Sequence, residues 1–506
     1  MTAPAETAVE VPWRRLDRRM LVVGPLGSLV RVVPLVVIVL FTGGSGDPVR
    51  LWIAAAAAVL VVLGGLVRWR TTRYRITAER VELHSGLFLR RRRSVPRDRI
   101  RTVDLTAKLL HRAFGLSVVQ VGAASGSPLE SARLDLDAVS KAEAERLRRE
   151  LLDRAPVDVD ATAEAPRADV LARLDWAWIR YAPLTFTALA GIGAVGATAF
   201  NLLDDLGLDP RDIGAVDAAA DRITTEPIWL TVLIVVGALL VLATVASVVL
   251  WAERWYGFAL TREAAGDGTT ALRVRRGLLT RRSLSVAEPR LRGAELVEPL
   301  LLRLGGGAQT RALSAGLDRD AQGGALHPPT PRAEADRVAS AALREPVAET
   351  TGAALRPHPP AARTRRLTRA VVPAAVVALA LGLLLGPAGW WGLLLVPAAA
   401  LLGLDRARAL GHRLTARHVV MREGTLVRRT VALRREGVLG WTVRQSPFQR
   451  RAGVVEVEAV TAAGHGGYRV LDVAAAEGVA LADATTPGLL TPWRTDAEEQ
   501  RAWPAS

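Results

Sequence analysis

The chain has 506 residues, half of them hydrophobic but only 5% aromatic, and it contains no cysteine. The lack of cysteine excludes disulfides, thiolate catalysis and metal sites with thiolate ligands. The formal net charge of +16 predicts an anionic partner, such as lipid headgroups, nucleic acid or an acidic protein.

Six apolar blocks, arranged in three pairs along the chain, predict membrane-spanning helices. A span requires about 20 apolar residues, within a range of about 17–25, and none of the blocks contains a charged residue. The third and fourth blocks have this length. The other four are shorter and are joined in pairs by a few small or polar residues, which is typical of tight helical hairpins. The blocks are 32–44, 51–67, 181–203, 228–251, 370–385 and 390–404.

Arginine flanks the outer ends of each pair of blocks, for example Arg14 and Arg15 before the first pair and Arg68 and Arg70 after it. The connection 201–227 instead carries seven Asp and Glu residues against two Arg. Positively charged flanks stay in the cytoplasm. We therefore expect a multi-pass plasma-membrane protein with both termini and three soluble domains on the cytoplasmic side.

The predicted organisation alternates transmembrane pairs with soluble domains. The expected boundaries are a cytoplasmic N-terminus with an interfacial lead-in (1–31), a first transmembrane hairpin (32–68), a first soluble domain (69–155), a linker (156–180), a second transmembrane pair (181–252) with an external loop (204–227), a second soluble domain (253–346), a linker (347–369), a third transmembrane hairpin (370–404), a third soluble domain (405–490) and a tail (491–506).

The three soluble domains repeat one pattern at one spacing. A glycine is followed four and five residues later by two arginines, and 26 residues later by the arginine of an R-x-x-G motif. Short alternating segments bounded by turn residues predict strands, and the glycine is expected at a positive-φ hairpin position. The glycines are Gly86, Gly277 and Gly424, and the motifs begin and end at Arg112 and Gly115, Arg303 and Gly306, and Arg450 and Gly453.

A helix is expected to close each copy. In the first copy, Ser140 followed by Glu143 is a capping-box signal, and Ala144, Leu147 and Leu151 form an apolar face. The corresponding helix of the third copy, around 474–484, is predicted to be interrupted by its glycine at position 478. Each copy is therefore predicted to be a small half-barrel of short strands closed by a C-terminal helix.

The first copy resembles the membrane-anchored bacterial PH-domain family (YdbS-like). The matching stretches are T-x-Y-R-I-T-x-x-R-V-x-L-x-x-G-L at 72–87, R-R-S-V-P-x-x-R-I at 92–100 and R-x-x-G-L at 112–116. The match is looser in the third copy and weakest in the second. The resemblance implies PH-like half-barrels and no established catalytic activity. Together with the apolar blocks, it predicts a polytopic α-helical membrane protein with three cytoplasmic PH-like domains, each a β half-barrel plus a C-terminal helix.

Runs of arginine are the candidate contacts for anionic phospholipid headgroups, since a basic residue near an anionic membrane surface contributes about 1 kcal/mol. The alternative is a solvated face that only sets the topology. Nucleic acid is not an expected partner, because no aromatic residues interleave the runs. The candidate lipid contacts are Arg90, Arg91, Arg92, Arg93, Arg97, Arg281, Arg282, Arg428 and Arg429.

No motif predicts a catalytic, metal or cofactor site, so the chain is expected not to be an enzyme and to need no cofactor. The predicted function is a non-enzymatic integral membrane protein that displays its PH-like domains at the cytoplasmic surface. The expected partners are the lipid bilayer, anionic headgroups, membrane or cytoplasmic proteins, and further copies of the chain in a homo-oligomer. The alternative is a channel or transporter-like protein, which the lack of ionisable residues inside the apolar blocks disfavours.

Overall fold

The computed structural model describes residues 12–24, 26, 48–77, 79–86, 91–97, 100–123, 133–152, 169–185, 228–264, 269–315, 317, 324–464 and 466–489. The chain divides into two compact units, Met1–Ser285 and Val286–Ser506. The apolar block 32–44, most of the block 181–203 and the predicted external loop 204–227 lie outside the described residues.

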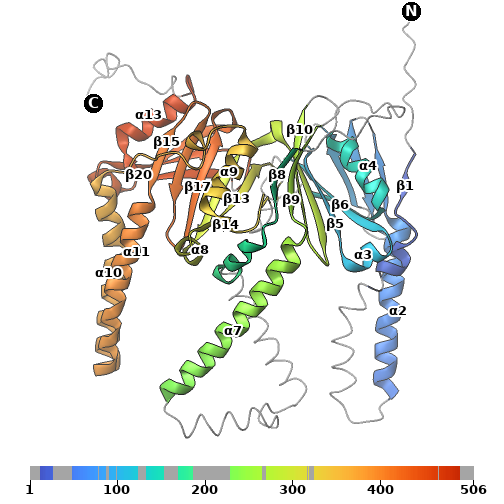
Figure 1. Cartoon of the computed structure of the whole chain (residues 1–506), viewed down its shortest axis with the longest axis horizontal. Coiled ribbons are helices and arrows are strands. Elements are labelled where there is room, and N and C mark those ends of the chain that lie inside the picture. Colours follow the sequence, from blue (N-terminus) through green and yellow to red (C-terminus); the bar gives the residue numbers. More distant parts are fainter. Residues whose placement is uncertain are drawn as a thin grey trace, which may run out of the picture. The chain divides into compact units, whose positions relative to one another are not determined.

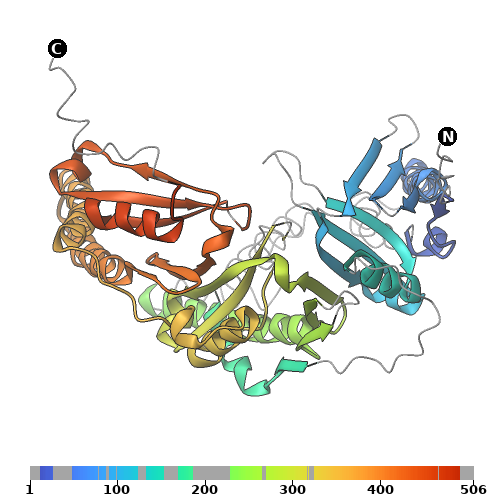
Figure 2. The same cartoon turned by 90° about the horizontal axis from the view of Figure 1, so that it is seen from above.

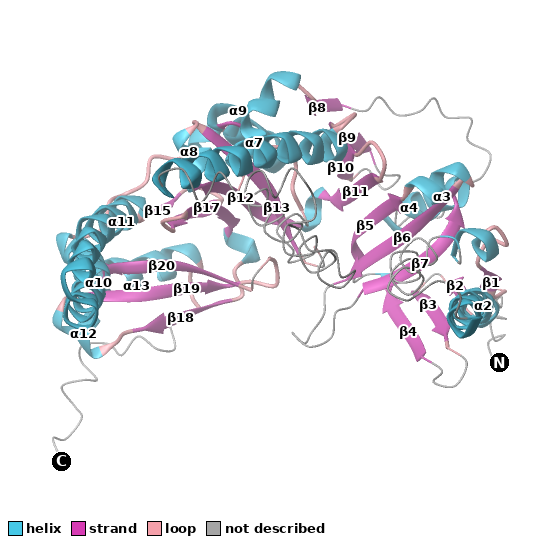
Figure 3. Cartoon of the chain, turned by 90° about the horizontal axis from the view of Figure 1, so that it is seen from below, coloured by secondary structure: helices cyan, strands magenta, loops and turns pink. Residues whose placement is uncertain are grey.

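The first unit contains a four-stranded and a seven-stranded sheet. The small sheet has the order β1 (Arg14–Arg15), β2 (Arg73–Ile76), β3 (Arg80–Ser85) and β4 (Arg91–Pro96). The large sheet, which Figure 3 shows from below, has the order β7 (Arg133–Ser140), β6 (Leu116–Ala123), β5 (Ile100–Ala107), β11 (Arg281–Ala287), β10 (Thr270–Arg276), β9 (Ala259–Ala264) and β8 (Asp169–Arg173). Its helices are α2 (Pro48–Thr71), α3 (Leu109–Ala113), α4 (Lys141–Leu152), the 3-10 helix η2 (Trp176–Leu184) and α7 (Ile228–Trp255).

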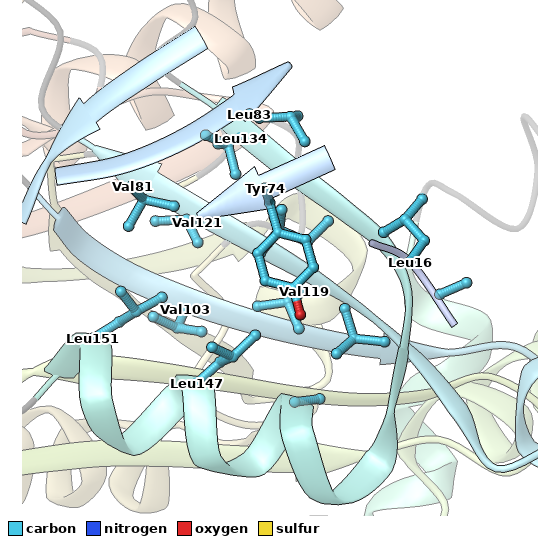
Figure 4. Close-up of a cluster of buried hydrophobic side chains, with 14 of the residues drawn as sticks. Leu16, Tyr74, Val81, Leu83, Val103, Val119, Val121, Leu134, Leu147 and Leu151 are labelled. Atoms are coloured by element: carbon cyan, nitrogen blue, oxygen red, sulfur yellow. The ribbon is translucent and has the colours of Figure 1, made fainter. Parts of the chain in front are cut away.

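A buried core joins the two sheets at the N-terminal end of this unit (Figure 4). Tyr74, Val81 and Leu83 of the small sheet pack with valines and leucines of β5, β6 and β7. Helix α4 closes the core with the predicted face, because Ala144, Leu147 and Leu151 are all buried. The backbone N–H of Glu143 donates to Ser140 Oγ at 3.3 Å, so the predicted start of this helix is confirmed.

The second unit contains a six-stranded and a three-stranded sheet. The larger has the order β14 (Thr330–Pro331), β13 (Gly307–Ser314), β12 (Leu291–Pro299), β17 (Val427–Arg434), β16 (His418–Glu423) and β15 (Gly411–Leu414), and the smaller has the order β18 (Gly440–Arg444), β19 (Val454–Val460) and β20 (Gly467–Ala474). The helices are α8 (Leu300–Leu304), α9 (Arg332–Leu343), α10 (Pro360–Leu385), α11 (Leu395–Ala409), α12 (Pro447–Arg451) and α13 (Ala475–Thr485), with short 3-10 helices η4 (Glu288–Arg290), η5 (Val347–Glu349), η6 (Gly386–Leu394) and η7 (Arg435–Gly437).

Helix α13 lies along one face of the small sheet (Figure 2), although the sequence predicted that Gly478 would interrupt it. A Cβ atom at this position would come within 2.8 Å of Val457 Cγ2 and of Val473 Cγ1. The glycine therefore lets the helix approach the sheet closely. The prediction of an interruption was wrong because the cost of glycine in a helix is offset by packing that the local sequence does not show.

One order of elements occurs three times along the chain. Three antiparallel strands are followed by a fourth strand, a short helix, further strands and a longer closing helix. The first series is β2–β3–β4–β5–α3–β6–β7–α4, the middle series is β9–β10–β11–β12–α8–β13–β14–α9, and the last series is β15–β16–β17–β18–α12–β19–β20–α13.

The series are joined through their strands. Within the first unit β5 of the first series is the neighbour of β11 of the middle series, and within the second unit β12 of the middle series is the neighbour of β17 of the last.

The predicted fold class, a polytopic α-helical membrane protein, is wrong. In the described residues, two stretches are long and apolar enough to cross a membrane, Val236–Trp255 and Pro360–Ala409. The second comprises α10, η6 and α11, and the two α-helices lie side by side (Figure 1). Four sheets contribute much of the remaining structure. The described chain is therefore a mixture of helices and antiparallel sheets, because the short-period patterns between the apolar blocks form extensive β structure.

Candidate functional site

The hairpin between β10 and β11 is held against the end of α7. Gly277 has φ 108°, and a Cβ atom there would lie 1.9 Å from the carbonyl oxygen of Thr280. The N–H of Gly277 donates to the carbonyl oxygen of Tyr256 at 2.9 Å, and that of Leu278 donates to the carbonyl oxygen of Glu253 at 2.8 Å. The backbone conformation at this position of the turn therefore requires glycine. The two hydrogen bonds fix the turn relative to the C-terminal end of α7.

A basic pocket of about 690 Å³ lies beside this hairpin, within the first unit. Its walls come from α3, the start of α4, the residues after α7, and strands β10 and β11. Seven cationic side chains and one carboxylate line it, so its field is strongly positive. The cationic residues are Arg112, Lys141, Arg273, Arg275, Arg276, Arg281 and Arg282, and the carboxylate belongs to Glu145.

The single carboxylate of the basic pocket is already engaged by arginines. Glu145 lies 2.8 Å from Arg148 and 3.0 Å from Arg273, measured between side-chain nitrogen and oxygen atoms. The same two arginines lie 3.0 and 3.1 Å from Glu263 on β9. This network joins α4 to β9 and β10. Burial raises the pKa of Glu145, but the two arginines lower it by more, so the pKa lies below its usual value. Little negative charge remains for the other cations of the pocket.

Arg276 is affected both by its burial and by this excess of positive charge. Burial, with added repulsion from Arg254 and Arg282, lowers the pKa of Arg276 to about 10. Its guanidinium lies 4.4 Å from the ring centroid of Trp255, a cation–π arrangement. Arg281 and Arg282 are exposed, and no carboxylate of the described residues lies within 4 Å of them. An anion entering the pocket would reduce this repulsion.

The predicted contacts in the first copy are distributed differently. Arg90 lies outside the described residues, and Arg91 is described only as the first residue of β4. Arg92 and Arg93 are exposed on β4. Arg97 donates to the carbonyl oxygen of Glu150 near the end of α4, so its side chain holds the closing helix. Arg92, Arg93 and Arg97 do not line the basic pocket.

The two predicted contacts in the last copy are paired inside the protein. Arg428 lies 3.2 Å from Asp405 of α11, and Arg429 lies 3.2 Å from Glu295 of β12. Both arginines are half-buried. Among the seven predicted contacts whose side chains the structure describes, Arg281 and Arg282 are therefore the two that line a positive cavity.

Two of the three R-x-x-G arginines connect neighbouring series, a role that the sequence analysis did not predict. Arg112 donates to the carbonyl oxygen of Leu278, and Arg303 donates to that of Thr425 at 3.4 Å. Leu278 and Thr425 are the residues directly after the hairpin glycines of the following series. The equal spacing of the glycines and arginines along the chain was the signal that could have suggested this contact.

A second charged cavity, of about 700 Å³, lies in the second unit. Six arginines and five carboxylates line it, so its charges nearly balance. Asp472, for example, lies 3.1 Å from Arg365 and 2.5 Å from Arg366. The ion pairs of Asp472 with these two arginines join α10 to β20. Among the described residues, no group of three or more His, Asp or Glu side chains could hold a metal ion.

Two segments of the chain are similar to a family of known proteins. Residues 25–155 and 367–482 match the model of the bacterial PH domain. The UPF0699 transmembrane protein YdbT of Bacillus subtilis (strain 168) is 34% identical over 107 residues, which is 21% of this chain and 21% of that protein. The chain thus aligns with about a fifth of the length of this relative. No solved structure matches the chain. The resemblance seen in the sequence is confirmed, since residues 25–155 and 367–482 match the bacterial PH domain.

Proposed function

We propose that this chain is a non-enzymatic membrane protein that displays PH-like domains at the cytoplasmic surface, and that the basic pocket binds the phosphate of an anionic lipid headgroup. The observation that carries the proposal is the set of seven cationic side chains against one carboxylate. The middle series of elements is included as a third PH-like domain, because its order matches that of the two segments recognised as bacterial PH domains.

The position of the pocket supports a membrane ligand. Tyr256 and Gly257 line the pocket and directly follow the candidate span Val236–Trp255. Leu278 and Leu279 at the tip of the adjoining hairpin are exposed. Apolar residues next to arginines at the end of a span suit the boundary between acyl chains and headgroups. A lipid phosphate at that depth would lie within reach of Arg281 and Arg282.

The expected affinity change follows from the charges removed. Each basic residue near an anionic surface contributes about 1 kcal/mol. Replacing both Arg281 and Arg282 by Gln should therefore weaken binding by about 2 kcal/mol, or about 30-fold. The matched control is Arg146→Gln with Arg149→Gln, because both residues are exposed on α4 and neither lines the pocket.

Native mass spectrometry of the full chain in micelles containing phosphatidylglycerol or phosphatidylcholine provides the test. The unaltered chain and the control variant should retain phosphatidylglycerol in preference to phosphatidylcholine, and the variant of Arg281 and Arg282 should lose this preference. Equal retention of both lipids by the unaltered chain would contradict the proposal. A preference that survives the loss of both arginines would contradict the assignment of the pocket.

A further inference from the structure

The junctions between successive series are built in the same way inside the chain. At each one, the third strand of one series lies beside the fourth strand of the preceding series, as β11 lies beside β5 and β17 beside β12. At each one, the R-x-x-G arginine of the preceding series, Arg112 or Arg303, donates to a carbonyl oxygen in the following hairpin.

The corresponding elements at the two ends of the repeat are left open. Strand β4 is the third strand of the first series and ends its sheet, and β18 is the fourth strand of the last series and ends its sheet (Figure 3). Within the described residues, β4 pairs with β3 and β18 pairs with β19. Arg450 of the last R-x-x-G motif is exposed, and no described residue accepts a hydrogen bond from its side chain.

We infer that β18 of one chain pairs with β4 of a second copy of this chain, forming a head-to-tail contact that repeats the internal junctions. Edge strands present unpaired N–H and C=O groups that can bind another strand. The two edges are different surfaces, so the contact is heterologous and can extend beyond a dimer.

The internal junction between β12 and β17 predicts the register of this contact. Leu296 is the partner of Thr430 in that antiparallel pair. Val443 occupies the position of Leu296 in the repeat, because each lies nineteen residues after the hairpin glycine of its series. Arg92 likewise occupies the position of Thr430, six residues after the hairpin glycine. The expected partners across two chains are therefore Val443 and Arg92. Val443 is 48% exposed, whereas Leu296 is fully buried, which leaves apolar surface at the open edge.

The arginines of β4 are compatible with this pairing. Arg428 and Arg429 of the inner strand β17 follow Gly424 by four and five residues in the sequence. Arg90 and Arg91 follow Gly86 by the same numbers of residues. Arg429 is neutralised across the internal junction by Glu295 at 3.2 Å. The edge strand β18 lacks an acid, but Glu456 and Glu458 lie on the adjacent strand β19. Arg469 lies 3.4 Å from both of these carboxylates, so they offer only a partial counter-charge to the arginines of the second chain.

Engineered cysteines can test the contact and its register, because the chain contains no cysteine of its own. One tagged full-length chain carries Arg92→Cys and a differently tagged chain carries Val443→Cys, and both residues are exposed. After mixing in detergent and mild oxidation, we expect a disulfide-linked heterodimer on a non-reducing gel. A second mixture with Ser94→Cys in place of Arg92→Cys shifts the pair by two residues and should link at least about tenfold less, because a disulfide needs Cα atoms about 4.4–6.8 Å apart.

A second variant tests the arginine contact independently of the strands. Arg450→Ala in the Val443→Cys chain should reduce linkage about tenfold, since it removes a charged donor, whereas Arg451→Ala on the same helix should leave linkage unchanged. As a positive control, Ala294→Cys with Ala432→Cys should link within one chain, because these residues are partners at the internal junction. If this control links but the two chains do not, or if both registers link equally, the inference is wrong.

Discussion

Asp472 offers a sharp test of how β20 and α12 are joined to helix α10. Its carboxylate contacts Arg365 and Arg366 of α10 and accepts a hydrogen bond of 2.9 Å from Gln449 Nε2 of α12. The side chains of Asp472 and Arg366 are 1% and 4% exposed. Asp472→Ala would therefore leave a buried guanidinium uncompensated, a change that costs about 3–5 kcal/mol.

The backbone of Asp472 adds a smaller contribution. Its φ is 55°, a left-handed conformation that Asp and Asn tolerate better than Ala. Asp472→Asn should thus destabilise the domain less than Asp472→Ala, since the amide can still accept from Gln449. Combining Asp472→Ala with Arg366→Met should recover part of the loss, because the second change removes the unpaired charge.

Hydrogen exchange of β20, measured by mass spectrometry on the full chain, reports this stability locally. A loss of 3 kcal/mol or more corresponds to exchange that is faster by at least about 100-fold. The control is Glu436→Ala, an exposed carboxylate for which about 0.5 kcal/mol or less is expected. If Asp472→Ala and Glu436→Ala change the exchange of β20 equally, or if Arg366→Met adds to the loss, the electrostatic reasoning is refuted.

Two further predictions concern the second unit. His327 is buried, which lowers its pKa to about 4 from 6.5, so its contribution to stability above pH 6.5 should fall by about 3 kcal/mol as the pH approaches 4. Burial also lowers the pKa values of His358 and His418 to about 4, so the unaltered chain should lose more than this. In acid unfolding, His327→Gln should reduce the pH slope of stability by the His327 share, and an unchanged slope would contradict this prediction. Gly424→Ala should lower the unfolding temperature far more than Gly453→Ala. A Cβ atom at Gly424 would lie 2.0 Å from the carbonyl oxygen of Val427, whereas a Cβ atom at Gly453 meets nothing within 4 Å. Similar unfolding temperatures for the two variants would contradict this assignment of the hairpin backbone.

Features that depend on near neighbours could be predicted from the sequence. The hairpin glycines, the short strands and the face of α4 all follow from patterns within a few residues, because turn geometry and helix periodicity are local properties. The resemblance to the bacterial PH family rests on the same short-range pattern. The class of membrane protein could not be predicted correctly, since apolar blocks identify candidate spans but do not measure how much of the chain is sheet.

The tertiary structure decided which charges meet. Arg428 and Arg281 occupy the same position in the repeat, yet the first is paired with Asp405 and the second lines a positive pocket. The N-terminal segment also enters the first core, where Leu16 and Met20 are buried. Such contacts join residues that are distant in sequence, and their energies depend on burial and on neighbouring charge. The repeat was therefore readable in the sequence, whereas the pairing of its strands and the pocket beside them required the fold.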